Sequence, residues 1–505
     1  MKTKQQMSAA LLARKILFFA LLADLLLMLS PSAWAVPSYA RRYGMECSGC
    51  HTMWGALTGP GVQFRLSGYR AIGGKDLTPI SEDIEIAKGA TIPSTLPLSF
   101  VTGVGYDSRT EKREASNGTS NTSNGSSIAL EDASIFMTSP LGQHLSAFVE
   151  FPMYETKAWE FTPTGKFEAN NTASNRQIQF AAENPTFEVA KFFWNNPLGD
   201  TTPRDSFNFL FGITHLPLGY ASGKVRLSVN QYLIYERRAL DLISPNRPSD
   251  VLGGADEYLF KLGEPQILAE AMGMLMFGKP VTDVSKRDTF WAEYHLGFTN
   301  GSNGKADNNT KKDLYGRWVM RWYLQSLGFF AYHSADQYDD TQRTNASIAG
   351  NPMGIMSGRQ DANSSNRRGI DFTLSLVPMG VPVWLENQYM SNNETNPTGF
   401  GREFKWKGGF HQLNWQISKT AIAYARYDYV KGDTFDDTMV TMNGVTGITA
   451  STPKEHDFVL GAQHLIEQNV KLVAEFRDHK FEDTATPTAA KLSDTGFTLR
   501  IMLGF

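Results

Sequence analysis

Apolar and polar residues alternate strictly along the last part of the chain. The apolar positions are Phe497, Leu499, Ile501, Leu503 and Phe505, and the positions between them are Thr498, Arg500, Met502 and Gly504. A period of two predicts a β-strand with one apolar face. A strand of an ordinary β-sandwich would show the same period, so the rest of the chain has to decide between the two folds.

Similar segments recur along the chain, and most have the length of about 9 to 11 residues that crosses a bilayer at a tilt. They are 98–106, 128–138, 144–154, 185–195, 206–216, 267–277, 289–299, 313–323, 327–335, 368–377, 382–390, 405–416, 421–430, 456–466, 470–480 and 495–505. Together they predict an all-β fold, a transmembrane antiparallel β-barrel of about sixteen strands.

The connections between these segments alternate in length. Short ones fall at 139–143, 196–205, 278–288, 324–326, 378–381, 417–420 and 467–469, and longer polar ones at 107–127, 155–184, 336–367, 431–455 and 481–494. Bacterial barrels have short turns on the periplasmic side and long loops outside. We therefore expect both termini in the periplasm. Residues 217–266 do not fit this rule. Their pattern is consistent with either a long loop with a helix folded into the pore or two further strands.

The alternation also predicts which side chains face the lumen. In 289–299 the apolar face directs Glu293 and His295 inward, and in 470–480 it directs Glu475, Arg477 and His479 inward. Arg317 and Arg321 share the polar face of 313–323. The predicted lumen is therefore charged, and either wet or filled by a plug.

The chain begins with the pattern of a signal peptide. Lys2, Lys4, Arg14 and Lys15 precede an apolar run over 16–29, and Ala33-Trp34-Ala35 forms a small-residue cleavage site. The alternative is a membrane anchor, but about 14 apolar residues are fewer than the ~20 that a spanning helix needs. We expect residues 1–35 to be cleaved on export and the mature chain to reach the bacterial outer membrane, with its lipid as a partner. The net charge of −3 predicts no nucleic-acid partner.

Both cysteines of the 505-residue chain lie in one short motif, Cys47-Ser48-Gly49-Cys50-His51. This C-x-x-C-H spacing is typical of the attachment site of a c-type haem. The two thiols form thioethers to the porphyrin, and the histidine that follows binds the iron as an axial ligand. A disulfide would leave His51 unexplained, a thioredoxin-like site needs a βαβ pattern, and a zinc site would lack a fourth ligand. The prediction is one covalent haem c.

The sixth iron ligand is not evident from the motif. Met45 and Met53 are near in sequence, and His295 and His479 are inward-facing candidates on predicted strands. No nucleophile–base pair or phosphate-binding loop stands out, so no catalytic residue is assigned. Residues 36–95 are too few for an independent cytochrome domain, and we expect them to form a haem-bearing plug in the lumen of a porin-like barrel over 96–505.

With VPSYARRYGMECSGCH followed by a predicted barrel, the chain resembles the fused monohaem cytochrome–porin proteins of the outer membrane, which include Fe(II) oxidases. The specific motif covers about 16 residues, and the barrel matches in pattern only. The resemblance implies a one-electron oxidoreductase that takes electrons from extracellular Fe(II) or a similar small donor and passes them to a periplasmic c-type cytochrome. Two alternatives stay open: a diffusion porin with a structural or sensory haem, and outward electron transfer to an extracellular acceptor. Assembly into homo-oligomers also stays open.

Overall fold

The computed structural model describes most of the chain after the predicted signal peptide. The described residues are 38–53, 56–73, 75–88, 90–114, 120–142, 144–160, 179–182, 188–222, 225–243, 260–277, 290–304, 310–337, 362–397, 402–435, 441–442, 445–446, 452–483 and 491–504. Within these ranges, no helix is long and apolar enough to cross a bilayer.

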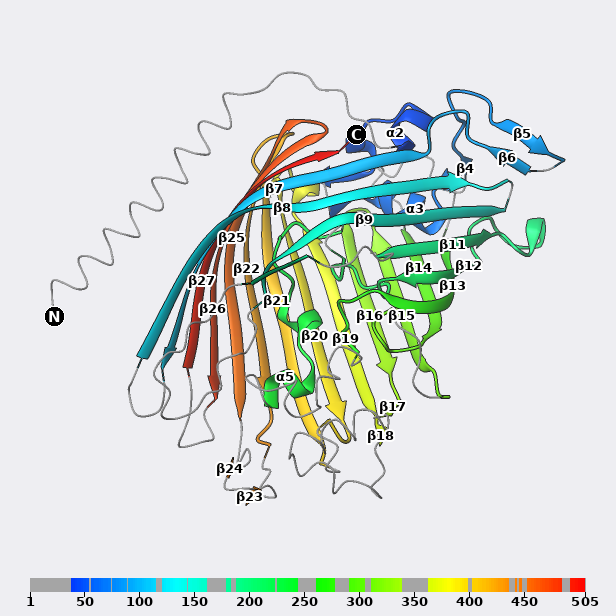
Figure 1. Cartoon of the computed structure of the whole chain (residues 1–505). Helices are drawn as coiled ribbons and strands as arrows, with labels where there is room; N and C mark the ends of the chain where they lie inside the picture. Colours follow the sequence, from blue (N-terminus) through cyan, green and yellow to red (C-terminus); the bar gives the residue numbers. More distant parts are fainter. Residues whose placement is uncertain are drawn as a thin grey trace.

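The described strands form one closed antiparallel barrel of sixteen strands (Figure 1). Its strands are β7 (Leu98–Glu114), β8 (Ser120–Pro140), β9 (Leu145–Glu160), β10 (Gln179–Ala182), β11 (Val189–Asn195), β12 (Asn208–Thr214), β13 (Gln266–Phe277), β14 (Phe290–Thr299), β15 (Asp313–Trp322), β16 (Gln325–His333), β19 (Ser365–Ser375), β20 (Val383–Glu394), β21 (Phe404–Gln416), β22 (Ala421–Gly432), β25 (Pro453–Glu467), β26 (Val470–Asp483) and β27 (Lys491–Gly504). β10 and β11 pair with successive stretches of β9 and count as one interrupted strand. The predicted all-β barrel is confirmed.

The last strand closes the barrel by pairing with the first. β27 runs antiparallel to β7 from Gly504 opposite Val101 to Lys491 opposite Glu114. Closure leaves no unpaired edge, which is what a sheet needs in lipid, where no water can bind free backbone groups. The alternating C-terminal segment is therefore the closing strand.

The two ends of the barrel differ in their connections. At one end, here called the turn end, the links include 323–324 between β15 and β16, 417–420 between β21 and β22, and 468–469 between β25 and β26. Figure 1 shows the N-terminal segment and the end of β27 there, with β17 (Asp336–Gln337), β18 (Ala362–Asn363), β23 (Thr441–Met442) and β24 (Val445–Thr446) at the opposite, loop end. The predicted short connections are confirmed where they are described. The residues 161–178, 278–289, 338–361, 436–440, 447–451 and 484–490 lie outside the described residues, and with them most of the predicted long loops.

The prediction of a loop over 107–127 is wrong. β7 and β8 continue as a paired ribbon until Glu114 lies opposite Ser120. Outward-pointing residues of this ribbon, such as Thr110 and Lys112, are polar and exposed. Beyond the apolar band of a barrel both faces of a strand can meet water, so the alternation that marks a membrane strand disappears while the backbone pairing goes on.

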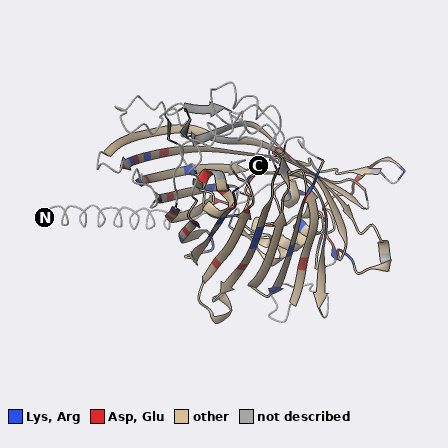
Figure 2. Cartoon of the chain, turned by 90° about the horizontal axis from the view of Figure 1, so that it is seen from below, with Lys and Arg blue, Asp and Glu red and all other residues tan. Residues whose placement is uncertain are grey.

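The facing of side chains agrees with the predicted alternation. On β14, Leu296 is 62% exposed on the outer surface, while its neighbour His295 is 3% exposed inside. On β15, Trp318 and Trp322 are exposed, and Arg317 is buried. Figure 2, seen from the loop end, shows basic and acidic positions near one another on the strands. The inward face is therefore charged, as expected.

The segment 217–266 adds no strand in the part that the structure describes. It contains two short helices, α4 (Leu233–Glu236) and α5 (Ala239–Ile243). Tyr232, Leu233 and Tyr235 are fully buried, and α4 contacts β21 and β22 while α5 contacts β21 and β25. Residues 225–243, here called the inner loop, thus lie against the inner wall (Figure 1). The barrel has sixteen strands and not eighteen because these residues bury their apolar side chains within the lumen.

The N-terminal segment contains only short elements. They are α2 (Ser38–Tyr43), the 3₁₀ turn η1 (Cys47–Gly49), β1 (His51–Met53), β2 (Ala56–Leu57), α3 (Gly59–Leu66), β3 (Ala71–Ile72), β4 (Lys75–Asp76), β5 (Ile84–Ala87) and β6 (Ala90–Ile92). Val62, Phe64, Leu66 and Tyr69 join a cluster with Phe193 and Leu210 of the barrel wall. Two further 3₁₀ turns, η2 (Gly199–Thr201) and η5 (Val377–Met379), lie in turn-end links.

Candidate functional site

The cysteines and the histidine of the motif lie in one compact turn. Cys47 starts η1, and the amide of Cys50 donates a hydrogen bond to the carbonyl of Cys47 at 3.1 Å. Both thiols are free and partly buried, and Cys50 packs against the main apolar cluster of the lumen. The local fold therefore places two thiols and an imidazole within one turn of backbone, as the haem-attachment chemistry requires.

The start of α3 holds this turn in place. The Thr58 amide donates to the Cys50 carbonyl at 2.9 Å, and the Thr58 hydroxyl donates to the Gly49 carbonyl at 3.2 Å. The same hydroxyl accepts from the Gly61 amide and so caps the helix. A Cβ atom on Gly61 would lie 2.1 Å from the Cys50 carbonyl oxygen, so only glycine allows this close approach.

His51 is held as a neutral imidazole. Burial, together with the nearby Lys471 ammonium, lowers the pKa of His51 to about 4. Its Nδ1 atom is buried and has no hydrogen-bond partner among the described residues. Neutral imidazole is the form that binds a metal. Two free thiols beside a neutral imidazole fit the attachment of a c-type haem. Among the described residues, no group of three or more His, Cys, Asp or Glu side chains is placed to hold a metal ion by itself.

Burial also makes the two thiols poorly reactive before any haem is attached. It raises the pKa of both Cys47 and Cys50 to about 11. Since only the thiolate is nucleophilic, we expect iodoacetamide to alkylate the haem-free, folded protein slowly at pH 7.5, and about tenfold faster for each pH unit up to pH 10. Mass spectrometry of quenched samples measures these rates. A rate that does not change over this range would contradict the prediction.

The structure places the four candidates for the sixth iron ligand differently. Met45 is partly buried two residues before Cys47. Met53 is 2% exposed and packs among apolar side chains of the wall and inner loop, namely Leu227, Trp384, Ile422, Tyr424 and Val459. The Met53 side chain thus belongs to an apolar cluster that is separate from the one that Cys50 contacts.

His295 has one engaged and one unengaged ring nitrogen. Its Nδ1 lies 2.8 Å from Glu270 Oε1, and the Tyr315 hydroxyl donates to the other oxygen of Glu270 at 2.8 Å. Its Nε2 is buried without a hydrogen-bond partner among the described residues. A carboxylate behind a histidine is the usual support of a metal ligand. Met45, Met53 and His295 remain predictions for the sixth ligand.

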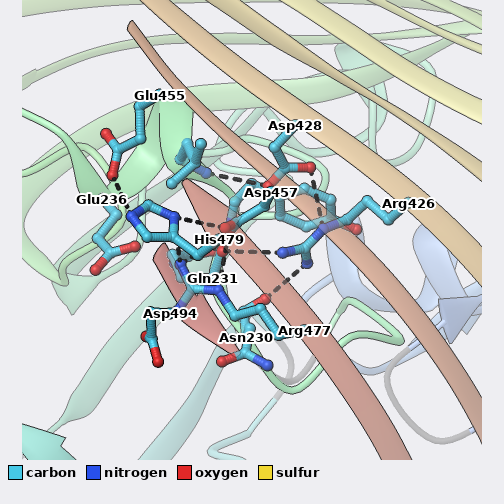
Figure 3. A network of polar contacts seen from close by, with 12 residues as sticks. Asn230, Gln231, Glu236, Arg426, Asp428, Glu455, Asp457, Arg477, His479 and Asp494 are labelled. Carbon is cyan, nitrogen blue, oxygen red and sulfur yellow. Dashed lines mark hydrogen bonds and ion pairs between the residues drawn. The ribbon is translucent and has the colours of Figure 1, made fainter. Parts of the chain in front are cut away.

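His479 has no free nitrogen. Its Nδ1 lies 2.6 Å from Asp457 Oδ1, and its Nε2 lies 3.1 Å from Glu455 Oε1 (Figure 3). Arg477 also pairs with Asp457, at 2.8 Å. Because both ring nitrogens face carboxylate oxygens, the arrangement suits an imidazolium that donates from both and argues against iron binding by His479.

The network in Figure 3 also fastens the inner loop to the wall. Arg426 of β22 donates to the backbone carbonyls of Asn230 at 2.8 Å and Gln231 at 3.2 Å. Arg237 of the inner loop makes a two-pronged contact with Glu455 of β25, with Nε 2.7 Å from Oε2. Such paired geometry is the strongest form of an arginine–carboxylate contact.

Glu475 of β26 is the second anchor of the inner loop. It accepts hydrogen bonds from the Ser228 hydroxyl at 2.8 Å and from the amides of Val229 at 3.0 Å and Asn230 at 3.1 Å. The Asn230 side chain and the Tyr424 hydroxyl donate to it as well. Glu475 was predicted to face the lumen, but its role was not, because its partners in the inner loop are more than 200 positions away in the chain.

Comparisons with known proteins give a likeness in architecture alone. No family model and no curated protein matches the chain. Among solved structures, the outer membrane channel DcaP of Acinetobacter baumannii has 9% sequence identity and a TM-score of 0.47, over 84% of this chain and 100% of that one. An anion-selective porin from Comamonas acidovorans has 12% identity and a TM-score of 0.44, over 81% of this chain and 100% of that one. The assignment of a closed barrel therefore rests on this chain's own strand pairing.

Proposed function

We propose that the chain is an outer-membrane barrel that carries one covalent c-type haem at its turn end and transfers single electrons. The donor is a small extracellular species such as Fe(II), and the acceptor is a periplasmic c-type cytochrome or a similar carrier. The observation that carries the proposal is the turn with two free thiols and a neutral imidazole, packed against the lumen-facing core of a closed barrel. When attached there, the haem would supply a one-electron redox centre.

The protein's own residues hold and shield this centre. Residues 46–51 are here called the attachment turn. Thr58 and Gly61 fix its backbone through the Cys50 carbonyl. Burial keeps His51 neutral over the physiological pH range, so that it is ready to bind iron. The apolar cluster around Cys50 limits the access of water from the lumen.

The outer-membrane part of the proposal rests on the exposed apolar belt. Leu296, Phe298 and Trp318 point outward from neighbouring strands and are each more than a third exposed. We expect Leu296→Arg to lower the stability of the barrel in lipid by about 2–4 kcal/mol, as a charge at mid-membrane depth does.

Urea unfolding in liposomes measures this loss. Thr122→Arg is the matched control, because Thr122 is exposed on the polar ribbon of β8 and its variant should remain as stable as the wild type. Equal stability of both variants would argue that residue 296 does not face lipid.

Stopped-flow spectroscopy of the haem-loaded protein in detergent tests the electron-transfer proposal. Mixing with Fe(II) should produce the reduced c-type bands rapidly, and a subsequent mix with an oxidised soluble c-type cytochrome should remove them. A haem that dithionite reduces but Fe(II) does not would exclude Fe(II) as the donor. It would leave the porin and outward electron transfer. A measured haem potential below that of the Fe(III)/Fe(II) couple would support outward electron transfer.

A diffusion porin with a structural haem is the second candidate. It is favoured by the closed barrel and by the ionised residues that line its inner wall, among them Arg317, Arg321 and Glu293. Rings of charged side chains select ions in pores. Conductance in planar bilayers separates the candidates. A steady, ion-selective current through the haem-loaded protein supports the porin, and the absence of current supports the electron carrier.

A further inference from the structure

A contiguous exposed strip joins the haem-attachment turn to the β5–β6 hairpin at the turn end. Glu46, Ser48 and Gly49 of the turn are exposed. Gly44, just before them, lies against Ile80: a Cβ on Gly44 would be 3.1 Å from the Ile80 Cδ1 atom. Ile80 in turn leads directly into the hairpin, which projects from the barrel in Figure 1.

The strip is unusually apolar for a surface. Ile80 is 67% exposed, Ile84 52% and Ile86 62%, and Ile92, which pairs with Ile84 across the hairpin, is 40% exposed. Both faces of β5 are exposed, although an isolated two-stranded hairpin has little stability of its own in water. Contiguous exposed apolar residues beside polar ones mark interaction sites.

The strip is also held in a fixed position. The Ile80 amide donates to the Arg42 carbonyl at 2.8 Å, and the Arg42 guanidinium pairs with Asp83 at 2.7 Å. The hydroxyl groups of Ser81 and Ser94 lie 2.7 Å apart at the base of the hairpin. A partner that docks there would thus meet a surface tied to the attachment turn through α2.

The charges around the strip decide which partner fits. Its exposed ionised groups are Glu46, Glu82, Glu85 and Lys88, so carboxylates are in excess. We propose that this strip docks a soluble one-electron carrier whose redox edge is apolar and ringed by lysines; this rests on the proposed function. An apolar centre with rim charges of opposite sign suits the small, short-lived interfaces of electron-transfer partners. The shortest route from the attachment turn to the carrier then runs through Glu46–Gly49.

The test uses the full-length, haem-loaded protein in detergent and two probes. The first is a lysine-rich soluble cytochrome c with zinc in place of iron, which reports binding by fluorescence without electron transfer. The second is the same cytochrome with iron, which reports electron transfer. Glu82→Lys and the double variant Ile84→Ser/Ile86→Ser are compared with Ile128→Ser, a change at an isoleucine that is 76% exposed on β8.

We expect both hairpin variants to bind the zinc probe about tenfold more weakly at low salt, and Ile128→Ser to bind it like the wild type. Higher salt should weaken wild-type binding, and an acidic cytochrome of equal size should not bind. Unchanged haem bands in every variant verify that the attachment turn is intact. Equal binding of all variants, or of the acidic probe, would overturn the proposal.

Two other occupants would show themselves in the same samples. A wild type that is oligomeric by light scattering and becomes monomeric in Ile84→Ser/Ile86→Ser would assign the strip to a second copy. Loss of association with lipid vesicles in that variant alone would assign it to a membrane surface. Zinc-probe binding with no electron transfer to the iron probe would count against the proposed function and leave the docking surface standing.

Discussion

Replacement of both Cys47 and Cys50 by Ser is expected to abolish covalent haem attachment while the barrel still folds. The thiols are the chain's only cysteines, so no other residue can form the thioethers. The barrel should remain because its closure depends on backbone pairing between β27 and β7, far from the motif in sequence. Haem staining of denaturing gels measures attachment, and the mobility difference between heated and unheated samples reports the folded barrel.

Ser48→Ala is the control within the same turn. The Ser48 side chain is exposed and donates to Glu46, so its removal should leave haem attachment at the wild-type level. A double cysteine variant that still carries haem after denaturation, or a wild type that never acquires it in a strain able to mature c-type cytochromes, would refute the assignment of the motif.

Replacement of Glu475 by Ala is expected to release the inner loop from the wall. The Ser228 hydroxyl and the amides of Val229 and Asn230 would lose their acceptor, and each unsatisfied buried donor costs about 1–3 kcal/mol. Local opening of residues 225–243 should therefore become roughly 10- to 100-fold more populated. Hydrogen exchange followed by mass spectrometry measures this opening peptide by peptide, and conductance in planar bilayers should rise at the same time.

Glu482→Ala on the same strand is the matched control. Glu482 is partly exposed and pairs with Lys491 at 3.7 Å at the surface, so exchange in the inner loop should not change. Wild-type exchange rates in Glu475→Ala would mean that Arg237–Glu455 and Arg426 suffice to hold the loop.

The fold could be predicted because the alternation of apolar and polar residues within a single barrel strand shows which of its side chains point outward. Leu296 beside His295 shows the inside and the outside of β14 without knowledge of any other strand. The ribbon over 107–127 was missed for the same reason. Outside the bilayer both faces of β7 and β8 carry polar residues, so the pairing there leaves no alternation of apolar and polar positions in the sequence.

The attachment site could be predicted only as far as its residues are neighbours in sequence. Cys47, Cys50 and His51 are proposed to bind haem through a spacing that lies within one turn of backbone. No local pattern indicated that Gly61, in the first turn of α3, would lie against the Cys50 carbonyl. The sequence also contained no sign that His479 would pair with Asp457, because Asp457 lies on a neighbouring strand.

The sequence by itself determined the closed barrel, the inward and outward faces of its strands and the C-x-x-C-H spacing on which the haem proposal rests, because solvent contrast and thiol spacing act over a few residues. Only the tertiary structure decided how the lumen is filled and how its charges are paired. Glu475 accepts hydrogen bonds from amides of the inner loop, and Arg237 donates to Glu455. The partners in each case are more than 200 residues apart in the chain. Closure of the barrel brings these groups together, and burial then requires each charge and each amide to find a partner.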